Sequence, residues 1–287
     1  MQKEKFEEIK AQVGAALANE VYGVTRVPGG DINEAYRVEI QSGDVVFLKA
    51  HETPPAGMFA AEADALAVLD AAHALRVPRV LAFGERWLAL EWIEAGKRDA
   101  RAYDEAFGQG LAVLHARRTG FGHARDNFIG VLPQTNTPLA TWAEFFAERR
   151  LKAMAKLGAD RGRLPLSVAK DIDWICTRMQ AFIGDEEPAS QLHGDLWGGN
   201  AMCDASGAPV LVDPAVYGGD REMDLAMMQL FGGFSPRVFS AYNETLPLRA
   251  GHQERVRLYQ LYPLLAHACM FGGGYVEQVK TVVTALM

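Results

Sequence analysis

The sequence of 287 residues lacks the marks of an exported, membrane-spanning or zinc-binding protein. It has only 3 cysteines, with no C-x-x-C pair and no histidine at zinc-ligand spacing, so we expect reduced thiols in a cytoplasmic protein. No stretch reaches the roughly 18 apolar residues that span a bilayer. The N-terminus carries acidic residues and no apolar core of a signal peptide.

An excess of basic charge is also missing. The chain holds 29 lysines and arginines against 36 aspartates and glutamates, which gives a net charge of -7. Contact with a phosphate backbone requires a basic surface, so we do not expect nucleic acid to be a partner. The hydrophobic share of 49% with 23% charged residues is ordinary for a chain that folds around a sizeable core.

The two common glycine signatures of nucleotide sites are absent as well. There is no G-x-x-x-x-G-K-[ST] segment, and the turn at 28–35 does not fit G-x-G-x-x-G. This turn, with Gly29 and Gly30, lies between two predicted strands. Its backbone amides can cradle phosphates, or it can be a plain glycine hairpin; the pattern leaves both interpretations open.

The period of the hydrophobic residues changes along the chain. An amphipathic helix is predicted over the first twenty residues, followed by strands and one helix. The expected strands are 22–27, 35–40, 45–50, 78–84 and 87–93, and the helix is 59–73. We expect an antiparallel sheet of five strands.

The rest of the chain is predicted to be mostly helical. The expected helices are 101–119, 138–158, 166–184, 224–232, 236–246, 254–270 and 275–286, with loops and strands at 191–219. A sheet-rich first third joined to a helical remainder predicts an α+β fold of two lobes. We expect a nucleotide-binding lobe at 1–93 and a catalytic and substrate-binding lobe at 94–287.

The segment with the clearest chemistry is His193-Gly-Asp-Leu-Trp-Gly-Gly-Asn200. Asp195 and Asn200 are five residues apart, the spacing of the kinase catalytic loop, in which the aspartate accepts the proton of the substrate hydroxyl and the asparagine binds a metal. An isolated H-G-D is common and can be a structural turn. Since Asp195 fills the base position, we expect His193 to brace the loop.

Two further features complete a phosphotransferase pattern. An apolar strand ends at Asp213, which places a carboxylate where it can bind magnesium. Lys49 ends the strand 45–50, and Glu62 lies thirteen residues later in a helix, as in the lysine and glutamate pair that holds nucleotide phosphates. Taken singly, both could be surface charges; together with Asp195, Asn200 and Asp213 they predict a magnesium-dependent kinase.

Several other residues allow both a structural and a functional interpretation. The backbone of Glu91, Trp92 and Ile93, at the crossing between the lobes, can bind adenine, or the segment can be an ordinary sheet edge with Trp92 in the core. Asp220 and Asp224 are expected to cap the helix that follows them. The aromatic residues Trp142, Trp197 and Tyr217 can stack on a sugar or pack in the core.

In these segments the chain resembles the fructosamine kinases, or ketosamine-3-kinases, of the aminoglycoside phosphotransferase-like branch of the protein-kinase-like fold. The resemblance spans nearly the whole chain. It is carried by 29–38, 61–66, 126–130, 142–146, 193–200, 213–226 and 271–275. Aminoglycoside and choline kinases share H-G-D and the later aspartate, but not these flanks.

The resemblance implies ATP-dependent phosphorylation of the 3-hydroxyl of a ketosamine, either a small molecule or a glycated lysine on a protein. The product is unstable and loses the sugar, so the reaction repairs glycation. By position, Asp195 is the base, Asn200 and Asp213 bind Mg²⁺, and Lys49 with Glu62 holds the phosphates. Asp31 stands where many relatives have cysteine, so thiol-based control is not expected at this position.

Three alternatives accompany this hypothesis. The first is a kinase of another small hydroxyl compound, such as an aminoglycoside or choline. The second is a non-catalytic nucleotide-binding scaffold, although no catalytic or metal residue is missing. The third is a protein kinase, for which the interval from Asp213 to Asp224 is too short to hold an activation loop. The sequence does not fix the sugar or the oligomeric state.

Overall fold

A computed structural model describes residues 3–28 and 32–287. The chain divides into two compact units, which are described separately. The first unit contains Met1–Tyr103 and Ala201–Pro214, and the second contains Asp104–Asn200 and Ala215–Met287. The predicted functional division into 1–93 and 94–287 stays a prediction.

The first unit is built on a five-stranded antiparallel sheet of order β1-β2-β3-β5-β4. Its strands are β1 (Val21–Val27), β2 (Glu34–Ile40), β3 (Val45–Ala50), β4 (Val80–Phe83) and β5 (Trp87–Glu91). The five strands confirm the sequence prediction to within a few residues at each end. The β-branched and aromatic residues in these segments explain the agreement, because they pack well on a pleated surface.

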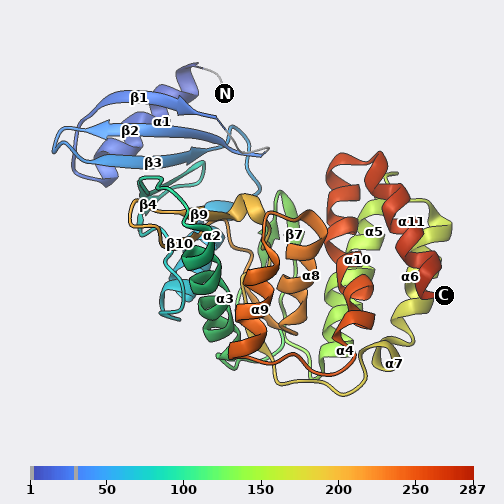
Figure 1. The fold of residues 1–287 in the computed structure, drawn as a ribbon. Helices are drawn as coiled ribbons and strands as arrows, with labels where there is room; N and C mark the ends of the chain where they lie inside the picture. The colour runs from blue at the N-terminus through green and yellow to red at the C-terminus, as the bar shows by residue number, and fades with distance from the viewer. Residues whose placement is uncertain (1–2, 29–31) are drawn as a thin grey trace. The chain divides into compact units, whose positions relative to one another are not determined.

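Two helices pack on this sheet. Helix α1 (Lys3–Ala16) crosses one face of the sheet (Figure 1) and buries Ile9 and Val13 among Val38, Leu48 and other sheet residues. Helix α2 (Met58–Asp70) contacts β4 and β5. Because side chains alternate along a strand, Leu48 and Ala50 face the α1 core while Lys49 points the other way, where it meets Glu62 of α2.

The hairpin of β9 (Ala201–Cys203) and β10 (Pro209–Leu211) belongs to the first unit. Arg76 connects this hairpin to the sheet. Its guanidinium donates to Asp204 in the hairpin and to Glu91 on β5, and its carbonyl accepts from the backbone N–H of Leu211. This connection places the end of β10, and the residues up to Asp213, in the unit that carries Lys49.

The second unit is mostly helical. Its long helices are α3 (Ala100–Ala116, which begins in the first unit), α5 (Ala153–Asp160), α6 (Leu166–Cys176), α8 (Glu222–Phe231), α9 (Pro236–Thr245), α10 (His252–Phe271) and α11 (Gly274–Leu286). Helix α10 lies between α8 and α11 (Figure 1) and contacts both. The core contains Trp142, Phe145, Phe146 and Tyr259. None of the described helices is long and apolar enough to cross a bilayer.

Two predicted helices are divided in the structure. The segment expected at 138–158 becomes α4 (Trp142–Phe145), capped by Thr141, then the π-helix η1 (Phe146–Lys152) and α5. The segment expected at 166–184 becomes α6 and α7 (Met179–Ile183). A hydrophobic period alone does not distinguish a π-turn or a short break from a continuous helix.

Short strands hold the loops of the second unit. Strand β8 (Ser190–Leu192) pairs with β11 (Tyr217–Gly219), and the turn η2 (Gly198–Asn200) ends the segment His193–Asn200. Strands β6 (Asn127–Ile129) and β7 (Leu132–Gln134) form a hairpin that the sequence analysis did not predict. Three-residue strands leave too short a pattern to recognise.

Acid should weaken the β9–β10 hairpin through Asp204. The hydrogen bond from Ser206, together with Arg76 and two backbone N–H groups, outweighs burial and lowers the pKa of this carboxyl to about 2. A depressed pKa stabilises the fold above the unfolded value near 4 and loses that contribution as the pH falls toward 2. Asp204→Asn should therefore flatten the pH dependence of the unfolding free energy between about pH 4 and 2, measured by denaturant titration.

Asp44→Asn serves as a control, because this exposed aspartate lies on a hairpin turn of the same unit. An unchanged acid dependence in Asp204→Asn would contradict the assignment.

Candidate active site

Lys49, Glu62 and Asp213 meet in the first unit. The Nζ atom of Lys49 lies 2.5 Å from Glu62 Oε1 and also donates to Asp213 Oδ1. The lysine is almost fully buried, whereas the Asp213 side chain is 46% exposed. The predicted lysine and glutamate pair is therefore formed, and an aspartate 164 positions from the lysine joins it.

Charge controls this cluster. Burial opposes the ammonium of Lys49, but the nearby charges of Asp213 and Glu62 outweigh it and raise the pKa of the lysine. Burial, reinforced by the like charge of Asp213, raises the pKa of Glu62. Asp213 has a φ of 56°, a conformation that non-glycine residues adopt rarely, although aspartate adopts it more often than most.

The other predicted nucleotide contacts are only partly visible. Gly29 and Gly30, like Asp31, lie outside the described residues. Strand β5 ends at Glu91, whose backbone N–H donates to the Arg79 carbonyl. Trp92 is only half-buried, and its Nε1–H donates to Glu94. The interpretation that places Trp92 in the core is therefore wrong. A role for Glu91, Trp92 and Ile93 in adenine binding stays a prediction.

The second unit carries the motif loop, defined here as His193–Asn200. The Asn200 side chain donates to the Asp195 carbonyl at 2.8 Å and to its carboxylate at 3.4 Å. Since the NH₂ side of the amide faces Asp195, the oxygen side is the one that a magnesium ion could take. His193 is fully buried, and its Nδ1 accepts the backbone N–H of Asp195 at 3.3 Å, the geometry of a brace.

Asp224 anchors the start of the motif loop. Its Oδ2 accepts the backbone N–H of His193 at 2.8 Å, and its Oδ1 accepts that of Gly194 at 2.9 Å. Burial alone would raise the pKa of Asp224, but the hydrogen bond from His115 and the N–H of Gly194 outweigh burial and lower it. The expected helix-capping role of Asp224 is thus wrong: its carboxylate serves a loop thirty residues earlier.

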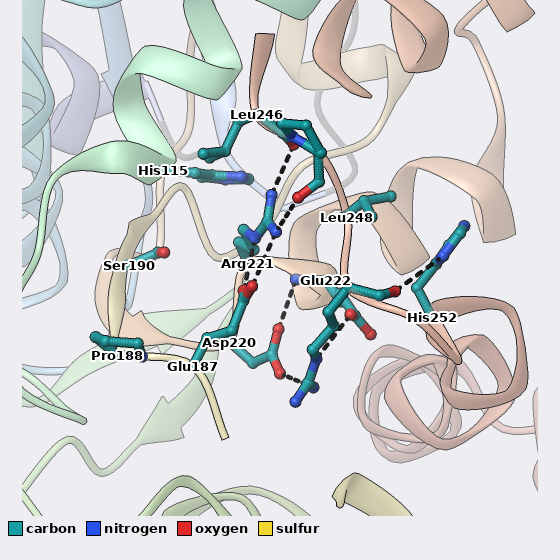
Figure 2. Close-up of polar contacts among 12 residues, drawn as sticks. His115, Glu187, Pro188, Ser190, Asp220, Arg221, Glu222, Leu246, Leu248 and His252 are labelled. Atoms are coloured by element: carbon teal, nitrogen blue, oxygen red, sulfur yellow. Dashed lines mark hydrogen bonds and ion pairs between the residues drawn. The ribbon is translucent and has the colours of Figure 1, made fainter. Parts of the chain in front are cut away.

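Asp220 does behave as a cap, because its Oδ1 accepts the N–H of Glu222 at 2.9 Å. It also joins a buried ionic network (Figure 2). Arg249 lies 2.5 Å from its Oδ2, and Tyr259 donates to the same oxygen at 2.8 Å. Burial, helped by the neighbouring Glu222 carboxylate, raises the pKa of Asp220 to about 6. Glu222 in turn accepts two hydrogen bonds from Arg255, each 2.8 Å long.

A second polar group supports the chain just after Asp213. Gln134 and Asn127 of the β6–β7 hairpin donate to the carbonyls of Ala215 and Val216. Arg150 of the π-helix is fully buried beside them, with its guanidinium 4.0 Å from the ring centre of Tyr217. π-Turns often occur at functional sites. This one places the Arg150 guanidinium against Tyr217 of β11, the strand that pairs with β8 just before the motif loop.

The structure separates the three aromatic candidates. Trp142 and Tyr217 are each 1% exposed and belong to the core, whereas Trp197 in the motif loop is 40% exposed. The packing interpretation therefore holds for the first two. For Trp197 both interpretations stay open.

Comparisons with known proteins give a consistent result. The sequence model of the family described as fructosamine kinase matches residues 1–287. The chain belongs to the fructosamine kinase family. A protein of Enterococcus faecium named "Probable ketoamine kinase" is 39% identical over 272 residues, which cover 89% of this chain and 92% of that protein.

Solved structures agree with this assignment. A fructosamine-3-kinase homologue from Thermobifida fusca superimposes with a TM-score of 0.87 at 37% identity, covering 97% of this chain and 98% of its own. A choline kinase from Streptococcus pneumoniae has a TM-score of 0.64 at 15% identity over 99% of both chains, a likeness of fold alone. These matches confirm the predicted α+β, protein-kinase-like fold, and the family identifies the protein as an ATP-dependent small-molecule kinase.

Gly194→Ala should disable the motif loop. An added Cβ would lie 2.0 Å from the Ala215 carbonyl oxygen, and the residue has a φ of +84°. Such a substitution should lower the unfolding free energy by about 1–3 kcal/mol and kcat by about tenfold or more, since the displaced loop carries Asp195. Chemical unfolding and steady-state kinetics measure both quantities.

Gly120→Ala is the matched control, because a Cβ there meets no atom within 4 Å. If both variants behave alike, the close approach at Gly194 does not position the loop.

Proposed function

We propose that this kinase phosphorylates the 3-hydroxyl of a ketosamine of the fructosamine or ribulosamine type and so initiates deglycation of the amine. The observation that carries the proposal is the membership of the whole chain in the fructosamine kinase family, combined with an intact Asp195 and Asn200 pair. The substrate would be a small ketosamine or a glycated lysine on a protein, and the product would release the sugar.

Asp195 would act as the general base. Its carboxylate would take the proton of the 3-hydroxyl as this oxygen bonds to the γ-phosphorus of ATP, while the bond from that phosphorus to the β,γ-bridging oxygen breaks and ADP leaves. The hydrogen bond from Asn200 and the His193 contact to the Asp195 backbone support this role, because they hold the carboxylate in one orientation.

Lys49 would contact the ATP phosphates, with Glu62 holding its ammonium in place. The buried pair supports this assignment, because a lysine fixed between two carboxylates stays charged. On nucleotide binding, phosphate oxygens would replace part of the Asp213 contact. The partly exposed Asp213 carboxylate would then be available to a metal.

Mg²⁺ would be held by the carboxylate of Asp213 and the amide oxygen of Asn200. Both are hard oxygen donors that suit this ion. Among the described residues no cluster of three acidic, histidine or cysteine side chains could form a complete metal cage. This fits an ion that usually takes one or two protein ligands together with substrate phosphates. When bound, Mg²⁺ neutralises charge that develops on the phosphate oxygens.

A substrate panel tests the proposed reaction. Purified protein with ATP and Mg²⁺ should release ADP in the presence of fructosamine and ribulosamine compounds, and phosphorus NMR should place the phosphate on the 3-oxygen. Choline and aminoglycosides should give no turnover above the background ATPase rate. Turnover of these alcohols without any turnover of ketosamines would refute the assignment in favour of the alternative kinase.

Asp195→Asn should abolish most of the activity. Loss of the proton acceptor should lower kcat by about 10²–10⁴-fold, while the KM for ATP and the thermal midpoint change little, because the side chain is only half-buried. Steady-state kinetics and calorimetry provide these values. Asp160→Asn, at an exposed position on α5, should match the wild type. A kcat for Asp195→Asn within threefold of the wild type would exclude Asp195 as the base.

A further inference from the structure

A series of buried hydrogen bonds leads from Arg221 to the motif loop. His115, near the end of α3, is fully buried and uses both ring nitrogens. Its Nε2 lies 3.2 Å from Asp224 Oδ2, and its Nδ1 lies 2.9 Å from the Tyr242 hydroxyl. The same Asp224 carboxylate holds the backbone N–H groups of His193 and Gly194. His115 is therefore one residue removed from the loop that carries Asp195.

The direction of each hydrogen bond follows from the chemistry of the partners. The Asp224 carboxylate only accepts, so Nε2 of His115 must carry a hydrogen in either charge state of the ring. Burial raises the pKa of Tyr242, so its hydroxyl keeps its proton. Arg221 Nη1 donates to this hydroxyl oxygen at 3.4 Å. The tyrosine O–H is then free to donate to Nδ1, which selects the Nε2–H tautomer of the neutral ring.

Arg221 fixes the far end of this series. Its guanidinium forms a two-bond contact with Glu187 at 2.7 and 3.0 Å and donates to the carbonyls of Leu246 and Pro247 at 2.8 and 2.6 Å (Figure 2). A planar guanidinium held at four points has little freedom to rotate. The position of the Tyr242 hydroxyl, and through it the choice of tautomer, is thus tied to a rigid group.

We propose that His115 is a positioning residue for phosphoryl transfer. Through its Nε2–H bond to Asp224 it holds the backbone at His193 and Gly194, and the Tyr242 hydroxyl, which donates to Nδ1, favours the same tautomer. The proposal rests on the role of Asp195 in the proposed function. A positioning role differs from a packing role, because any side chain of similar volume can replace a residue that only fills the core.

Two substitutions separate positioning from packing. His115→Leu fills the space but removes the donor to Asp224, whereas glutamine in His115→Gln can place an amide N–H near the position of Nε2. We expect kcat on a ketosamine to fall by about tenfold or more in His115→Leu, with the KM for ATP within about twofold of the wild type. His115→Gln should restore most of the lost kcat.

Leu111→Ala is the control for stability. This residue is one turn earlier on α3 and is fully buried. Its truncation leaves a cavity that should lower the thermal midpoint. Well below its thermal midpoint its kcat should remain that of the wild type. If Leu111→Ala and His115→Leu lower kcat equally, or if His115→Gln is as slow as His115→Leu, the positioning role is refuted.

Measurements without substrate test the same series of hydrogen bonds. Nitrogen NMR of the ¹⁵N-labelled protein should show His115 with hydrogen on Nε2. Tyr242→Phe removes the hydroxyl that donates to Nδ1 and should shift the Nδ1 resonance while Nε2 keeps its hydrogen, a test that stands even if His115→Leu does not fold. Amide exchange at Gly194 should be slow in the wild type and in His115→Gln. An Nδ1–H tautomer in the wild type would overturn the proposal, whereas absence of ketosamine turnover with the expected tautomer would refute only the proposed function.

Discussion

The carboxylate of Asp224 is the contact on which the motif loop depends. Its two oxygens accept the backbone N–H groups of His193 and Gly194, and both residues are buried. A buried N–H group that loses its acceptor costs about 1–3 kcal/mol, so the loop has one strongly preferred position. Asp195 follows immediately. The position of the candidate base is therefore set by a buried aspartate whose carboxylate holds the loop backbone.

The two units use charge in different ways. In the first unit Lys49 is held by Glu62 and by the partly exposed Asp213, an arrangement that a nucleotide and a metal can rearrange. In the second unit the ion pairs of Asp220, Arg221 and Glu222 are buried and saturated with hydrogen bonds, so they resist rearrangement. Buried ion pairs are weak evidence for stability. Here they border a loop whose geometry must be fixed.

Local patterns explain which parts of this structure the sequence predicted. The strands, α2 and the Lys49–Glu62 pair follow from alternation and from a spacing of thirteen residues along the chain. The function of Asp224 was missed because its partners lie thirty residues earlier, and acids in a first helical turn usually serve the helix dipole. His115 gave no signal, since a single histidine on an apolar helix face has no recognisable pattern. Only tertiary contacts assign such residues.

The family-specific flank Gly218-Gly-Asp-Arg-Glu-Met-Asp224 now has a physical meaning. A Cβ at Gly218 would lie 1.9 Å from the Gly120 carbonyl oxygen, and the charged residues that follow form the ionic network and the loop anchor. These residues support the motif loop. The residues of this flank therefore belong to the scaffold that supports Asp195 and Asn200. The sugar and amine preferences depend on the residues that contact the substrate, and the exposed aromatic residue Trp197 of the motif loop is a candidate. Family membership thus leads to the reaction class sooner than to the particular ketosamine.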